Sequence, residues 1–105
     1  MFNLNELCVM AYENAAKREA KDGKVSTDTM QMLKHTATEV VEATEAYTDH
    51  EYIDKPRSKA VFASELADIV CCVLIIAGKE NIDMEYALTA CMEKNYMRAT
   101  GRGDK

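Results

Sequence analysis

The stretch from Val61 to Ala77 constrains this chain most, because it is almost wholly apolar yet contains two carboxylates, Glu65 and Asp68. No Pro or Gly interrupts it, so one continuous helix is expected. At about 100° per residue, the two acids lie about 60° apart on one helical face, which continues with Val61, Cys72 and Ile75. A helix that is apolar on all sides is expected to be buried, and buried carboxylates are costly unless positive charge holds them.

The rest of the chain predicts three more helices. Helical periodicity covers residues 3 to about 21, 26 to about 47 and 83 to about 99, and the apolar helix lies between the last two. Candidate N-caps are Asn3 or Asn5, Ser26 or Thr27, Ser58 and Asp83, while Gly23 and Gly78 are placed to end the first and third helices. We therefore expect an all-α fold of four mostly antiparallel helices, in a single domain over residues 1–105 with a frayed tail at 100–105.

The second and fourth predicted helices each have an apolar stripe that is expected to face the core. In the second, the stripe is Leu33, Ala37, Val40, Thr44 and Tyr47, widened by the small residues Thr36, Ala43 and Ala46. In the fourth, the stripe is Met84, Leu88 and Cys91, and the same face continues to Asn95 and Arg98 beside Lys94. The first part of the fourth helix should therefore present an apolar face to the core, and the same face should be cationic near the end of the helix.

Charge and cysteine content exclude several classes of protein. The net charge of −5 and the absence of a long basic run argue against nucleic-acid binding. Two acids within the apolar run argue against a membrane span, and the N-terminal residues do not resemble a signal peptide. The four cysteines form no C-x-x-C motif, so we expect them to be reduced and buried. These features predict a cytoplasmic protein with no nucleic-acid or membrane partner.

Two acidic pairs with the same spacing suggest a metal site. Glu39-x-x-Glu42 and Glu65-x-x-Asp68 each place two carboxylates one turn apart, so two facing helices would direct four into one space. Several ionised carboxylates can lie together in a pocket that excludes water only if cations are bound there. Mg²⁺ fits best, because it binds carboxylates, waters and substrate phosphates. The alternatives are a solvated acidic face for the first pair and salt bridges to Lys or Arg for the second. Di-iron and zinc sites are disfavoured, because neither His35 nor His50 supplies the required spacing.

A second polar group lies near the end of the fourth predicted helix. Lys94 and Arg98 are one turn apart with Asn95 between them, which suits the binding of phosphate oxygens. The alternative is that these cations only complement the helix dipole.

The order and spacing of these motifs resemble the MazG-like all-α nucleotide pyrophosphohydrolases. The resemblance covers residues 26 to about 100 and is closest over ELADIVCCVLIIAGKENIDMEYALTACMEKNYMR, with its acidic apolar helix, Asn-Ile-Asp link and Lys-Asn-x-x-Arg ending. There are two departures. The family often has two adjacent acids at the first motif, where Thr38 stands here, and Ala99-Thr100-Gly101 replaces the frequent aromatic-proline ending.

The resemblance implies a reaction and roles for these residues. A nucleoside triphosphate would be cleaved between its α and β phosphates, giving the monophosphate and pyrophosphate, with Mg²⁺ required and Mn²⁺ as a substitute. Carried over by position, the metal ligands would be Glu39, Glu42, Glu65 and Asp68, and Glu39 or Glu42 would also orient the attacking water. Phosphate or sugar would contact Lys94, Asn95 and Arg98, and His35 would flank the site near the base or remain a surface residue.

The resemblance also implies a homodimer or tetramer in which both subunits contribute to the site. The apolar helix agrees with this expectation in a general way, since we expect four short helices of one chain to leave part of it uncovered. An alternative of another class is a non-catalytic helical oligomerisation or regulatory module in which the acids pair with Lys or Arg. A third reading is a family member that binds nucleotides without cleaving them. Nothing in the sequence selects the base.

Overall fold

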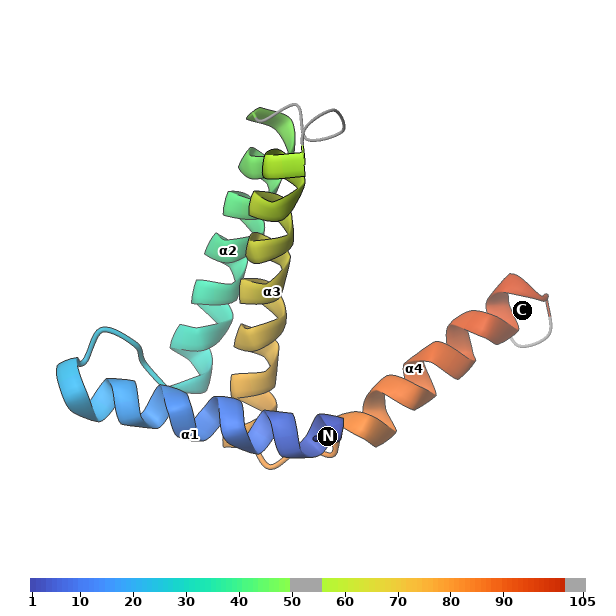
Figure 1. The fold of residues 1–105 in the computed structure, drawn as a ribbon. Helices are drawn as coiled ribbons and strands as arrows, with labels where there is room; N and C mark the ends of the chain where they lie inside the picture. Colours follow the sequence, from blue (N-terminus) through green and yellow to red (C-terminus); the bar gives the residue numbers. More distant parts are fainter. Residues whose placement is uncertain (50–55, 102–105) are drawn as a thin grey trace.

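The computed structural model describes residues 1–49 and 56–101, which form four α-helices and no strand. The helices are α1 (Leu4–Asp22), α2 (Thr29–Asp49), α3 (Pro56–Lys79) and α4 (Met84–Ala99). Figure 1 shows α2 and α3 as an upright antiparallel pair, with α1 crossing one end of the pair and α4 projecting away from it. The predicted all-α, four-helix fold is therefore confirmed, and residues 102–105 of the predicted frayed tail lie outside the described residues.

Helix α1 begins and ends as predicted. The Asn3 side chain accepts a hydrogen bond from the backbone N–H of Glu6, and the Glu6 carboxylate accepts one from the N–H of Asn3. This reciprocal pair is a capping box, which satisfies two N–H groups that the helix leaves free. Gly23 ends the helix with a φ of 68°, a left-handed conformation in which glycine carries no β-carbon penalty.

The start of α2 differs from the prediction. The Asp28 carboxylate accepts a hydrogen bond from the N–H of Gln31 at 3.0 Å, as an N-cap does. The two predicted caps instead stabilise the α1–α2 connection: Thr27 donates its hydroxyl and its N–H to Glu19, at 2.6 and 3.1 Å. The Ser26 hydroxyl accepts a hydrogen bond from the N–H of Asp28. Sequence reasoning chose the wrong member of a run of three cap-forming residues, because each has a side-chain oxygen.

Helix α3 is longer than predicted at both ends. It begins at Pro56, before the predicted cap Ser58, because proline fits the first helical position, where no N–H bond is lost. It continues through Gly78 and ends in a Schellman motif, in which Ile82 donates to the carbonyl of Ala77 and Asn81 to that of Gly78. Asn81, with a φ of 55°, occupies the left-handed position that was expected of Gly78.

Gly78 has a packing role instead. A β-carbon at this position would lie 2.3 Å from the carbonyl oxygen of Cys8 and 2.8 Å from Cβ of Tyr12. Glycine therefore lets α3 touch the backbone of α1, which fixes how α1 crosses the α2–α3 pair. The hydroxyl of Thr29 also donates to the carboxylate of Glu80, which ties the start of α2 to the end of α3.

The core is made of small residues. Its buried apolar members are Cys8, Ala15, Met32, Ala43, Ala46, Cys72 and Ala77. The prediction that Leu33, Val40 and Tyr47 face the core is wrong, since these side chains are 50%, 47% and 45% exposed. α2 packs against α3 with its small-residue face because small side chains let two helices approach closely. The expectation that all four cysteines are buried fails for Cys71 and Cys91, although all four are free thiols.

Helix α4 buries none of its residues, so the prediction that Met84, Leu88 and Cys91 enter the core is wrong. Asp83 caps the helix as expected, accepting from the N–H of Tyr86 at 3.0 Å. The start of α4 is joined to the start of α1, where the Asn5 side chain bonds both Asp83 and the N–H of Glu85. Beyond this joint α4 runs free of the α2–α3 pair (Figure 1).

One chain leaves much of α3 uncovered. Leu66, Val70 and Val73 are 45%, 55% and 39% exposed, although α1 and α2 both pack against this helix. The segment Lys59–Lys79 is long and apolar enough to cross a membrane by length and composition alone, and only 11% of that window is buried within the chain. The prediction that α3 is buried on all sides is therefore not met by one copy of the chain.

Candidate metal centre

Three of the four predicted acids meet where α2 and α3 face each other. Oxygen atoms of Glu39, Glu42 and Glu65 all lie within 4.8 Å of one another, close enough to hold one metal ion. The i, i+3 spacing places Glu39 and Glu42 on one side of α2, and the antiparallel pairing brings Glu65 of α3 opposite them. We refer to these three residues as the carboxylate cluster.

Two oxygens of the carboxylate cluster are buried without a partner. Glu39 is only 9% exposed, and its Oε2 atom and Oε2 of Glu65 have no hydrogen-bond donor. A buried carboxylate oxygen that is neither hydrogen-bonded nor paired costs free energy. Among the side chains that the structure describes, which leave out those of residues 49–58, the ion pair recorded at these acids is the one between His35 and Glu39, and it involves neither Lys nor Arg. The alternative of a salt bridge to Lys or Arg therefore has no partner in the described part of the chain.

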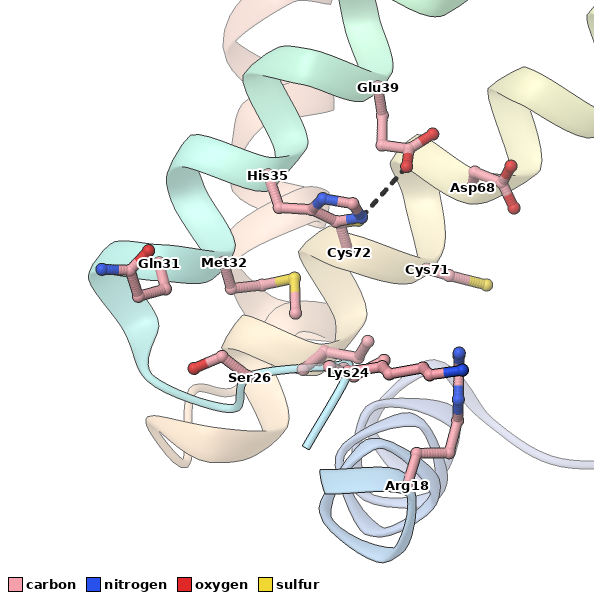
Figure 2. Close-up of a pocket in the computed structure, with 12 residues that line it drawn as sticks. Arg18, Lys24, Ser26, Gln31, Met32, His35, Glu39, Asp68, Cys71 and Cys72 are labelled. Carbon is pink, nitrogen blue, oxygen red and sulfur yellow. Dashed lines mark ion pairs between the residues drawn. The ribbon is translucent and has the colours of Figure 1, made fainter. Parts of the chain in front are cut away.

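His35 contacts the cluster from one turn earlier on α2. Its Nε2 atom lies 3.0 Å from Oε1 of Glu39, the dashed contact in Figure 2. The His35 side chain is 55% exposed, whereas that of Glu39 is 11% exposed. His35 thus contacts one oxygen of Glu39, and the other, Oε2, is buried without a hydrogen-bond partner.

The environment of Glu39 disfavours its charged form. Burial raises the pKa of this carboxyl, and the negative charges of Glu42 and Asp68 raise the pKa further, while His35 opposes the rise. A divalent cation would reverse this effect, because it stabilises the ionised form of every carboxylate around it.

The fourth predicted acid, Asp68, lies beside the cluster at the rim of a cavity. Asp68 is exposed, and together with Glu39 it lines a space of about 520 Å³ between α1, α2 and α3. Figure 2 shows Glu39 and Asp68 on the same side of this space, with His35 below Glu39. The other lining residues are Arg18, Lys24, Val25, Ser26, Gln31, Met32, His35, Cys71, Cys72 and Ile75.

The donor set suits a hard divalent cation. Carboxylate oxygens are the ligands that Mg²⁺ and Mn²⁺ prefer, and the unpartnered oxygens of Glu39 and Glu65 are free to bind one. Cys72 is buried nearby, but burial raises the pKa of its thiol, so the thiolate required by a softer metal is disfavoured.

The predicted phosphate-binding residues lie apart from the cluster. Lys94, Asn95 and Arg98 are exposed on α4, which Figure 1 shows extending away from the α2–α3 pair. Within one chain the structure therefore does not bring them to the carboxylates. The cations that line the cavity are instead Arg18 of α1 and Lys24 of the α1–α2 connection, which sequence reasoning missed. No local pattern marks them, because their position depends on how α1 crosses the other helices.

Comparison with protein-family models, with curated proteins and with solved structures finds no match.

Proposed function

We propose that this protein is a Mg²⁺-dependent nucleoside triphosphate pyrophosphohydrolase of the MazG-like type. It would cleave its substrate between the α and β phosphates to a nucleoside monophosphate and pyrophosphate, and Mn²⁺ would substitute for Mg²⁺. The observation that carries the proposal is the pair of buried, unpartnered oxygens of Glu39 and Glu65 within a cluster of three carboxylates. A metal ion supplies the positive charge that these atoms lack.

Each acid has a role in this proposal. Glu39, Glu42 and Glu65 hold the metal, and Asp68 completes the set from the rim of the cavity. A bound Mg²⁺ would neutralise charge on the phosphates and lower the pKa of a water molecule. Glu39 or Glu42 would orient that water, and the contact from His35 keeps one oxygen of Glu39 in place.

The proposal includes a homodimer or tetramer. Apolar side chains are left exposed on α2, α3 and α4, among them Val41, Val70 and Met92 at 58%, 55% and 62%. A second copy would bury these faces, and burial of apolar area is what stabilises most subunit interfaces. In such an assembly α4 of a second copy could bring Lys94, Asn95 and Arg98 to the phosphates that the first copy binds.

A second copy fits the uncovered face of α3 better than a membrane does. Glu65 and Asp68 lie near the middle of the helix, and charged groups within a bilayer are costly. The four free cysteines suit a reducing compartment, so we propose a cytoplasmic protein. Sedimentation at equilibrium measures the assembly, and a mass equal to one chain would contradict this part of the proposal.

The test of the reaction is pyrophosphate release from a panel of canonical and modified nucleoside triphosphates, with Mg²⁺ and with EDTA. We expect metal-dependent release that Asp68→Asn and Glu65→Gln abolish. The matched control is Glu45→Gln, which removes the same charge from an exposed position on α2 outside the cluster. Pyrophosphate release that continues in EDTA would contradict the assignment. So would an equal loss of release in Glu45→Gln.

A thermal shift separates this proposal from a non-catalytic module. Because metal binds only the folded cluster, millimolar Mg²⁺ should raise the melting temperature of wild type but not of Glu65→Gln. In the metal-free protein Glu65→Gln should be tolerated, since it removes a charge from a group of like charges. If the acids were paired with a cation, the same change would cost about 3–5 kcal/mol.

A further inference from the structure

The cavity of about 520 Å³ has two chemically different walls. Glu39 and Asp68 contribute carboxylates from α2 and α3, while Arg18 and Lys24 contribute cations from α1 and the connection that follows it. Figure 2 shows the Arg18 and Lys24 side chains reaching toward the part of the cavity beneath Cys71, across from the acids. A cavity of this size is within the range that binds small molecules and cofactors.

The two cations lack a carboxylate partner. Within the described residues, neither Arg18 nor Lys24 forms an ion pair, although the chain carries a net charge of −5 and has many acids available. Like charges that line one cavity repel each other, so an anion between them would be stabilised by both. Arg and Lys are also the side chains that bind phosphate oxygens best, Arg through a planar fork and Lys as a point charge.

Hydrogen bonds fix the backbone around Lys24 at this wall, while its side chain is exposed. Gly23 turns the chain with a φ of 68°, and the N–H of Lys24 donates to the carboxylate of Asp22. Three residues later, Thr27 is joined to Glu19 of α1 by two hydrogen bonds. The connection is therefore tied back to the same helix that carries Arg18.

We propose that Arg18 and Lys24 form the subsite that binds the β and γ phosphates of the nucleoside triphosphate. The proposal rests on the function proposed above, because the metal of the carboxylate cluster would hold the α phosphate at the opposite wall. A water oxygen bonds to the α phosphorus, and the bond from that phosphorus to the bridging oxygen breaks. Pyrophosphate leaves with the electron pair, the proton of the water passes to a carboxylate of the cluster, and the two cations stabilise the charge on the leaving group.

The assignment gives the cavity its substrate class. In this assignment the ligand carries three phosphates, with the α phosphate at the metal and the β and γ phosphates at the two cations. Nucleoside monophosphates, which lack the β and γ phosphates, would lose the cationic contacts. The subsite also places phosphate-binding cations in the same chain as the acids, whatever Lys94 and Arg98 do in an assembly.

The experiment measures binding of inorganic tripolyphosphate in Mg²⁺ by calorimetry, together with KM for the best triphosphate of the panel. Arg18→Gln and Lys24→Gln should each weaken tripolyphosphate binding and raise KM by about tenfold to a hundredfold, the range for loss of one charge-assisted hydrogen bond. Matched controls are Lys17→Gln and Lys21→Gln, which remove the same charge from exposed positions of α1 that do not line the cavity. Arg18→Lys should recover part of the loss, because it keeps the charge without the fork.

The outcomes separate this inference from the proposed function. If Asp68→Asn abolishes turnover while Arg18→Gln and Lys24→Gln bind tripolyphosphate like wild type, the subsite is refuted and the function stands. An equal loss in the Lys17 and Lys21 controls also refutes it, since the effect would then be one of overall surface charge. If wild type releases no pyrophosphate but binds tripolyphosphate through Arg18 and Lys24, the anion subsite stands and the catalytic function falls. Failure of wild type to bind tripolyphosphate at all refutes the subsite.

Discussion

Replacing Gly78 with alanine tests the contact that sets the position of α1. The added β-carbon would lie 2.3 Å from the carbonyl oxygen and 2.9 Å from the carbonyl carbon of Cys8. Both are backbone atoms, so no side-chain rotation can relieve the overlap. To reach an ordinary van der Waals distance, the two helices must separate by about 1 Å. A gap of that size removes about a quarter to a half of the dispersion energy of each atomic contact along the interface.

The expected size of the effect is a balance of two terms. Alanine gains about 1 kcal/mol over glycine inside a helix, which favours the variant. Overpacking a close contact costs about 1–3 kcal/mol, and a clash with backbone belongs at or beyond the upper end of that range. The net loss should therefore be about 2 kcal/mol. For a domain near this size that corresponds to a melting temperature lower by about 8 °C or more.

The assay is thermal and urea unfolding of Gly78→Ala and wild type at equal protein concentration. The control is Ser64→Ala, an exposed substitution in the same helix that should stay within about 0.5 kcal/mol of wild type. Because Arg18 lies on the helix that is displaced, KM for the triphosphate should also rise in Gly78→Ala. A variant as stable as wild type, or more stable by the helix-propensity gain, would refute the close approach of α1 and α3.

Three further predictions concern titration, the α1–α2 connection and the end of α3. Since burial raises the pKa of Glu39, this carboxyl should contribute stability to the metal-free protein that is fully present below the ordinary glutamate pKa of about 4.3 and is lost as the pH rises through the raised value. Urea midpoints in EDTA check this, and a pH dependence that Glu39→Gln leaves unchanged would contradict it. Hydrogen bonds from Thr27 lower the pKa of Glu19; the bond from the hydroxyl has the larger effect and the bond from the N–H the smaller one. The Glu19 carboxylate therefore contributes stability above its ordinary pKa, and this stability is lost as the pH falls through the lowered pKa of the folded state. Thr27→Val should reduce the acid-dependent loss of stability and lower the melting temperature at neutral pH. Asn81→Ala should be about 1 kcal/mol less stable than Asn81→Gly, because only glycine adopts a φ of 55° without a β-carbon penalty, and equal melting temperatures would argue against the left-handed cap.

Part of the carboxylate cluster could be predicted from the spacing of acids along the chain. Two i, i+3 pairs were enough to predict that acids from two helices converge, and Glu39, Glu42 and Glu65 do so. The sequence did not show which of these acids is buried. That depends on how α2 packs against α3, which buries Ala43, Ala46 and Glu39 and leaves Glu42 exposed.

The sequence by itself determined the features that depend on neighbours along the chain. The helix class, the capping box at Asn3, the left-handed turn at Gly23 and the cap at Asp83 follow from residues within one turn of each other, where hydrogen bonding and backbone sterics act directly. Only the tertiary structure decided which face of α2 is buried, how closely Gly78 lets α1 approach, and that α4 leaves the α2–α3 pair. It also decided that Arg18 and Lys24 line the cavity with the acids. These features arise from contacts between segments distant in sequence, where side-chain volume and the crossing of helices select one arrangement among several that the same periodicity permits.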